Sequence, residues 1–149
     1  MKPVKTWILI ADGARARVLL NEGPGHGIQV VEGLVFHGDH SATHDLVSDR
    51  EGRSYSSQGM RRSAIEPHSD PHRELKKTFA HQLADMLAHE LEQHTYDRLV
   101  IVAPPVALGD LRAAISDHVR SKVVGEVAHD LTKVPNDKVE KHLEGILGT

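Results

Sequence analysis

The stretch KTWILIADGARARVLLN, Lys5 to Asn21, sets the start of the fold. A near-continuous apolar run ends in Asp12-Gly13, and the residues after it alternate small or apolar side chains with Arg15 and Arg17. An apolar run joined to an alternating run by Asp-Gly is typical of a β-hairpin. Side chains two residues apart lie on the same side of a strand, so we expect the two arginines to share one face.

Beyond this hairpin the chain changes its periodicity several times. Residues 28–37 (IQVVEGLVFH) predict a third strand, and Gly33 interrupts its alternation where a β-bulge would fit. Residues 37–70 have almost no apolar periodicity, which predicts a long mobile loop. The rest of the chain predicts a helix, a strand, a helix, a strand and a helix, at residues 70–96, 97–105, 106–121, 122–131 and 135–147.

The order of these elements predicts the topology. Short apolar strands joined by helices require parallel crossovers, whereas the first three strands form an antiparallel meander. We therefore expect one α/β domain over residues 1–149, with a mixed five-stranded sheet ordered 3-2-1-4-5. This is a ribonuclease-H-like layout, with helices packed on the sheet and the loop following the third strand.

Composition limits the class of protein. With 149 residues, 39% hydrophobic and 26% charged, the chain has the size and balance of one globular domain. The apolar piece TWILIA is too short to span a bilayer or to form a signal-peptide core, so we expect a cytoplasmic protein. The chain has no cysteine, which excludes disulfides and thiol chemistry, and its net charge of −3 gives no overall attraction to nucleic acid.

Histidine is the unusual component, with twelve residues spread along the chain. No pair of them follows the HExxH pattern, and they form no compact set of ligands. We therefore predict surface histidines, with no metal site and no cofactor.

A basic segment lies inside the expected loop, SDREGRSYSSQGMRR at residues 48–62. Its positive charge could meet a phosphate or an acidic partner, whereas the alternative is a solvated loop without a role. Tyr55 is the only aromatic residue of the segment, which disfavours a module that reads RNA sequence by stacking. The candidate binding residues here are Arg50, Arg53, Arg61 and Arg62, to which the strand residues Arg15 and Arg17 are added.

A second candidate site lies where parallel strands end. Ligands of open α/β sheets favour the carboxyl ends of the strands, and a helix N-terminus attracts anions. Asp12, Pro105 and Asp130 should meet at this edge and are tentative binding residues. In the alternative, Asp12 closes a turn, Pro105 starts a helix and Asp130 organises a loop.

Catalysis finds little support in the sequence. Two-metal phosphoryl transfer needs several converging carboxylates, but the expected fourth strand ends in Ala103-Pro104-Pro105. No phosphate-binding glycine loop, nucleophile elbow or Ser-His-Asp spacing is present. We assign no catalytic residue and expect no enzymatic activity.

Four segments resemble one bacterial family, the host-attachment proteins, named for a protein required for attachment to host cells. They are WILIADGARARVLLNEG, LVSDREGRS, LVIVAPPVALGDLR and GEVAHDLTKVPNDKVEKHL, in the same order as in the family. The chain departs from the family pattern at Glu51, His129 and Val134. Val134 stands where Thr or Ser would cap the last helix. The resemblance implies a binding or interaction protein with a part in bacterial attachment to host cells.

The predicted layout also resembles, more distantly, the middle domain of archaeal and eukaryotic class 1 peptide-chain release factors. That domain carries a Gly-Gly-Gln tripeptide in the loop after its third strand, whereas this chain has only Gln58-Gly59. The alternative function is therefore a translation- or RNA-associated factor without peptidyl-tRNA hydrolysis. The sequence does not identify the partner; a protein or an anionic molecule such as RNA could be held through the basic loop, and the edge where the parallel strands end is the alternative binding surface.

Overall fold

The computed structural model describes residues 4–23, 26–38 and 71–144. The predicted sheet is confirmed, with the strand order β3-β2-β1-β5-β6. The expected loop lies outside the described residues from residue 39 onward. The strands are β1 (Thr6–Ala11), β2 (Arg15–Asn21), β3 (Gln29–His37), β5 (Arg98–Val102) and β6 (Val123–Val127). The helices are α3 (Pro71–Glu92), α4 (Pro105–Ala114), α5 (Asp117–Arg120) and α6 (Asn136–His142).

The central strand β1 explains why the sheet is mixed. It pairs antiparallel with β2 and parallel with β5, and β6 continues the sheet parallel to β5. All six of its residues are buried, because helices cover the sheet on both sides. Trp7 and Leu9 belong to one core, and Ile8 and Ile10 belong to the other. The continuous apolar run in the sequence therefore corresponds to a strand without a solvent face.

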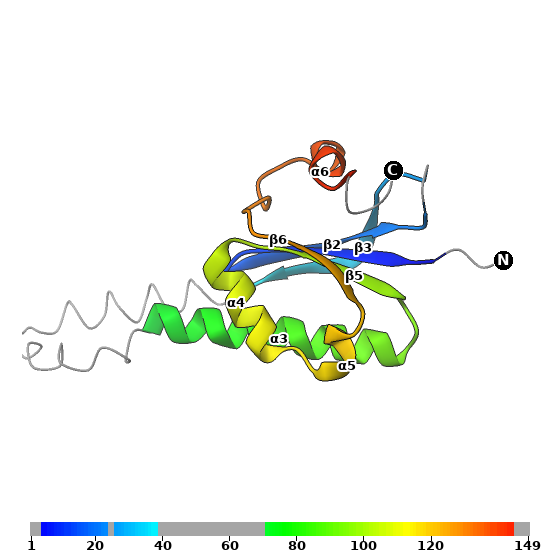
Figure 1. Ribbon diagram of the computed structural model, residues 1–149. Coiled ribbons are helices and arrows are strands. Elements are labelled where there is room, and N and C mark those ends of the chain that lie inside the picture. The colour runs from blue at the N-terminus through cyan, green and yellow to red at the C-terminus, as the bar shows by residue number, and fades with distance from the viewer. Residues whose placement is uncertain (1–3, 24–25, 39–70, 145–149) are drawn as a thin grey trace, which may run out of the picture.

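The larger core lies between the sheet and the helices α3, α4 and α5, which Figure 1 shows below the sheet. The ring of Trp7 stacks on that of Tyr96, with 4.7 Å between the centroids. The Tyr96 hydroxyl donates a 2.7 Å hydrogen bond to the Leu87 carbonyl. Burial, together with the nearby Glu90 carboxylate, raises the pKa of Tyr96 to about 12, so this donor stays protonated.

The smaller core lies between α6 and the opposite face of the sheet. Leu131, Val139 and Leu143 pack on Ile8 and Ile10 from there. Pro135 precedes the first turn of α6, and no side chain caps this helix. The missing cap agrees with what Val134 implies, so α6 must be fixed by other contacts.

One predicted element is wrong. Residues 106–121 were expected as one helix, but they form α4 and the short α5. Ile115 leaves the helical conformation with φ −73° and ψ 148°, and the Ser116 hydroxyl then accepts a hydrogen bond from the Val119 amide at 3.2 Å. Ile115 and Val119 are both buried, so the apolar stripe continues through a break that a capping serine creates.

The edge strand β3 contains the predicted irregularity. Gly33 has φ +83°, and the pairing of β3 with β2 shifts register between the partners of Arg17 and Leu19. A side chain is strained at such a φ, so glycine fits this position. The shift places Val30 opposite Leu19 and Val35 opposite Arg17, which directs both valines to the α6 side of the sheet.

The end of α3 also adopts a left-handed conformation. His94 has φ 58°, and its amide bonds to the Leu91 carbonyl at 3.0 Å. The Thr95 amide bonds to the Glu90 carbonyl at 3.0 Å. This pair of bonds is the Schellman motif, in which glycine usually occupies the position that His94 holds.

Candidate functional site

The β1–β2 turn stands at the edge where β1 and β5 end. The Asp12 carboxylate accepts hydrogen bonds of 2.7 Å from the amides of Ala14 and Arg15. Burial would raise the pKa of Asp12, but these two amides and the Arg15 guanidinium outweigh it, so the pKa lies below its ordinary value of 3.8. Asp12 is thus an ionised carboxylate that organises the turn.

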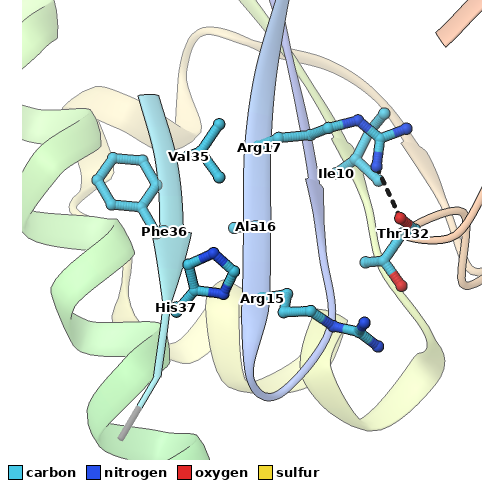
Figure 2. Close-up of a pocket in the computed structure, with 8 residues that line it drawn as sticks. All are labelled: Ile10, Arg15, Ala16, Arg17, Val35, Phe36, His37 and Thr132. Atoms are coloured by element: carbon cyan, nitrogen blue, oxygen red, sulfur yellow. Dashed lines mark hydrogen bonds between the residues drawn. The ribbon is translucent and has the colours of Figure 1, made fainter. Parts of the chain in front are cut away.

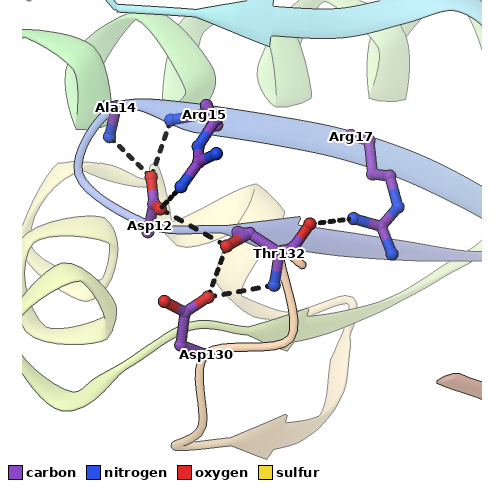
Figure 3. Close-up of polar contacts among 6 residues, drawn as sticks. All are labelled: Asp12, Ala14, Arg15, Arg17, Asp130 and Thr132. Atoms are coloured by element: carbon purple, nitrogen blue, oxygen red, sulfur yellow. Dashed lines mark hydrogen bonds and ion pairs between the residues drawn. The ribbon is translucent and has the colours of Figure 1, made fainter. Parts of the chain in front are cut away.

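Asp12 also faces the connection between β6 and α6, as Figure 3 shows. The Thr132 hydroxyl lies 2.5 Å from Asp130 Oδ1 and 3.4 Å from Asp12 Oδ2. A hydroxyl has one proton, and the shorter distance indicates that it goes mainly to Asp130. The Thr132 amide donates to the same Asp130 oxygen at 2.9 Å. The two aspartates therefore meet across one threonine.

Arg17 binds the same connection more tightly. Its Nε donates to Asn136 Oδ1 at 2.9 Å, and its Nη1 and Nη2 donate to the carbonyls of Thr132 and Val134 at 2.8 and 2.6 Å. Burial lowers the pKa of this guanidinium, which nevertheless stays charged. We call the set Asp12, Arg17, Asp130, Thr132 and Asn136 the polar latch, because it ties the segment before α6 to the β1–β2 hairpin.

A pocket of about 190 Å³ opens beside the latch, on the α6 side of the sheet. Figure 2 shows Val35, Phe36 and His37 on β3 next to the arginines of β2. Val35 is 57% exposed, and the Arg15 side chain is 47% exposed at the rim. We call this the sheet-face pocket; its lining is Ile10, Arg15, Ala16, Arg17, Val35, Phe36, His37 and Thr132.

A smaller cleft of about 90 Å³ lies beside the β1–β2 turn, where α3 meets the start of α4. Arg73 of α3 forms an ion pair with Asp110 of α4 across it. A Cβ atom on Gly13 would lie 2.8 Å from Cγ of Lys76, so this glycine lets the lysine cross the turn. We call this the α4 cleft; its lining is Gly13, Arg73, Lys76, Pro104, Val106, Ala107 and Asp110.

The structure brings together only some of the candidate binding residues that were predicted from the sequence. Asp12 and Asp130 do come together, through Thr132. Arg15 and Arg17 line the same pocket, but all three donor groups of Arg17 bond within the protein. Pro105 is the first residue of α4. The remaining candidates, Arg50, Arg53, Arg61 and Arg62, lie outside the described residues.

Several site residues went unnoticed in the sequence. Thr132 and Asn136 complete the latch, and Arg73 and Lys76 line the α4 cleft. The only sequence signal for Thr132 was its place two residues after Asp130, which is the spacing of an Asx turn. Arg73 and Lys76 are three residues apart and so share one helix face, but no pattern shows that the face meets α4.

Within residues 4–23, 26–38 and 71–144, no group of three or more histidine or acidic side chains is placed to hold a metal ion. In the same part of the chain, no helix has the length and apolarity that a bilayer-spanning helix needs.

Comparison with known proteins identifies the family. No curated protein matches the chain. The family model described as "Protein required for attachment to host cells" matches residues 7–143, which include every described strand and helix apart from the first residue of β1. The match also contains the latch and both openings. The chain therefore belongs to the host-attachment family, as its sequence motifs predicted.

Proposed function

We propose that this protein is a non-catalytic binding protein that binds its partner at the sheet-face pocket. The observation that supports this most directly is the composition of the pocket. Its apolar lining includes the side chains of Ile10 and Val35, and Arg15 and His37 add polar groups. The neighbouring carboxylates of Asp12 and Asp130 already accept hydrogen bonds from backbone amides and Thr132, so they serve the architecture of the edge.

The chemistry of the pocket favours a protein partner. An exposed β-branched side chain beside an arginine can receive an apolar residue and a neighbouring carboxylate of one peptide segment. Val30 extends the apolar surface along β3, since it is 58% exposed and points to the same side as Val35. An acidic segment with one large apolar residue fits these features best.

The family description concerns attachment to host cells, and we propose that the partner connects this protein to that process from the cytoplasm. In a strain that lacks the protein, wild-type protein should restore attachment and the pocket variant Val35→Asp should restore less. Cell fractionation would check the cytoplasmic location.

An RNA-associated role is the second candidate. Arg15, Arg73 and Lys76 surround the β1–β2 turn and present cationic groups on both sides of it. Such charges bind phosphates without reading a sequence, and the binding weakens steeply as salt rises. Co-sedimentation with ribosomes at two salt concentrations, before and after nuclease treatment, would detect this role.

A photo-crosslinking amino acid placed at Val35 tests the leading proposal in living cells. The matched control is Val124, which is also an exposed valine, 53% accessible, but lies on the opposite edge strand. We expect a nuclease-resistant protein adduct from position 35 and none from position 124. Excess wild-type protein should compete the adduct away, whereas the Val35→Asp variant should not. Equal adducts at both positions, or an adduct that nuclease removes, would contradict a protein partner at the pocket.

A further inference from the structure

The apolar strand surface that α6 covers continues beyond α6 as an exposed surface. Cross-strand neighbours form two rows on this face of the sheet, which are Val30, Leu19, Ile8 and Val100, and Val35, Arg17, Ile10 and Val102. The apolar members on β1, β2 and β5 are fully buried, whereas the two valines of β3 are more than half exposed. Since cross-strand neighbours on one face contact each other, the exposed valines and the smaller core belong to one apolar surface.

The covered part of this surface lies under a short segment, residues 131–144, which contains α6 and which we call the strap. The buried apolar residues of the strap are Leu131, Val139 and Leu143. α6 has only seven residues and no side-chain cap at its N-terminus. A helix this short has little stability of its own, so the strap depends on these apolar side chains and on its bonds to Arg17.

Arg17 is the charged member of the two rows, and its charge meets no carboxylate. Its three bonds to the strap go to neutral acceptors, which are two backbone carbonyls and the amide oxygen of Asn136. In the described part of the chain no aspartate or glutamate forms an ion pair with it, and burial alone lowers its pKa. A carboxylate can bind a guanidinium through two parallel hydrogen bonds and neutralise it, which carbonyls cannot do. An incoming carboxylate would therefore compete with the strap for Arg17.

The open pocket alone is small for a protein partner. A stable interface buries about 800 Å² on each side and involves about 20–30 residues. The sheet-face pocket has eight lining residues. Without the strap, the surface would gain four more strand residues, which are Ile8, Leu19, Val100 and Val102. The interface that a protein partner needs is therefore more nearly complete once the strap has moved.

We propose that the strap is autoinhibitory and that the partner displaces it, with an acidic amphipathic helix taking the place of α6 and binding Arg17 through a carboxylate. This displacement rests on the proposed function, because it is the route by which that partner reaches the sheet. The strap itself supplies the pattern for the partner helix, since Asn136, Val139 and Leu143 follow one another at helical spacing. The partner needs an acidic residue in place of Asn136 and large aliphatic residues at the two later positions.

The first measurement asks whether the strap opens while the rest of the protein stays folded. The chain has no cysteine, so Val139→Cys and Ala84→Cys each introduce a single thiol. Both positions are buried, one under the strap and the other on the α3 face. Under native conditions we expect a disulfide reagent to label the Val139→Cys protein at least roughly tenfold faster. Equal rates would overturn a strap that opens on its own.

The second measurement uses two synthetic peptides as probes, both with the sequence of residues 131–144, one unchanged and one with Asn136→Asp. Fluorescence anisotropy measures their binding to the full chain carrying Val139→Asp, which places a charge in the smaller core and ejects the chain's own strap. We expect the Asn136→Asp peptide to bind about tenfold more tightly than the unchanged peptide. Both should bind the wild-type chain more weakly, because its own strap competes intramolecularly. Adding Arg17→Gln to the chain should make the two peptides bind equally, which a loss of packing alone would not do.

His142→Asp is the matched control, because it adds the same charge to an exposed position of α6. The chain with this change should bind the peptides as the wild-type chain does. Slow amide exchange in α3 must persist in the Val139→Asp chain. If it does not, Leu143→Ala, which loosens the strap less, takes its place and should also bind the peptides more tightly than wild type.

The Asn136→Asp peptide should also suppress the photo-crosslinked adduct at position 35. Equal binding of the two peptides, or peptide binding that leaves the adduct unchanged, would overturn displacement of the strap by the partner. Absence of the adduct even without peptide would contradict the proposed function instead. In that case the two peptide affinities would still decide whether the groove under the strap selects an acidic helix.

Discussion

On one face of the sheet, α3 runs for 22 residues and buries a row of apolar side chains against β1, β2 and β5. On the other face, α6 has seven residues, no side-chain cap and a small core, and the polar latch ties its leading segment to the β1–β2 hairpin. Burial of apolar area is cooperative over a whole face, whereas a latch of hydrogen bonds is local. We infer that the α3 face sets the global stability and that the α6 face opens first.

The largest effect should come from Leu87→Ala. Leu87 and Leu143 both have 0% exposure, but Leu87 lies on the α3 face and Leu143 on the α6 face. We expect Leu87→Ala to lower the free energy of unfolding by about 3–4 kcal/mol and Leu143→Ala by about 2, because the smaller core can relax around the lost volume. Denaturant titration of both variants measures this difference, and equal losses would show that the two faces unfold as one unit.

Arg17→Ala should be next, with a loss of about 2 kcal/mol. It removes three hydrogen bonds from a charged donor, two to carbonyls of the segment before α6 and one to the first residue of α6, in a partly exposed setting that reduces their value. Amide hydrogen exchange should accelerate in residues 131–143 and stay slow in α3. Arg17→Lys keeps the charge without the fork of donors, so it should recover only part of the protection. Uniform acceleration across both faces would contradict a local latch.

His94→Gly should stabilise the protein by about 0.5–1 kcal/mol. The φ of 58° at His94 strains a residue with a Cβ atom, and glycine relieves this strain. Glycine also raises the conformational entropy of the unfolded chain, which offsets part of the gain. The gain should appear in the melting temperature and in the exchange of α3, since the residue ends that helix. His94→Ala is the control, and a gain of the same size in that variant would exclude backbone strain as the cause.

The smallest effect concerns acid. The pKa of Asp12 is lower in the folded protein than its ordinary value of 3.8, so the ionised carboxylate stabilises the fold at pH values above 3.8. This contribution is lost as the pH falls through the lower pKa of the folded protein. Asp12→Asn should therefore be less stable than wild type by about 0.5 kcal/mol at pH 7, and the difference should be smaller at pH 3. Thermal melts at the two pH values decide this, and a difference that grows in acid would refute the sign.

The topology could be predicted because the spacing of the apolar residues indicates which segments are strands and which are helices. The buried run of β1, the alternation of β2 and the helices between later strands leave few arrangements that obey crossover rules. The break between α4 and α5 was missed because Leu111, Ile115 and Val119 continue one apolar stripe, and all three are indeed buried. The overlooked signal was Ser116 followed by Asp117, a common helix start.

The site could be predicted only in outline. The rule that strand ends gather at one edge brought Asp12 and Asp130 together correctly. It could not reveal that Arg17 reaches Asn136, because these residues are 119 positions apart and nothing in the sequence marks the pair. The same limit applies to Arg73 and Asp110, whose ion pair depends on how two helices cross.

The register shifts of the two outer strands have a consequence for self-association. β3 shifts against β2 near Gly33, and β6 shifts against β5 between the partners of Leu99 and Val100. An outer strand with a regular row of free amides and carbonyls is a template on which another chain can add, and this is how edge-to-edge aggregation begins. Here both outer strands are irregular, so neither presents a long flat row. The exposed valines of β3 can therefore remain available to a partner without recruiting further copies of the chain.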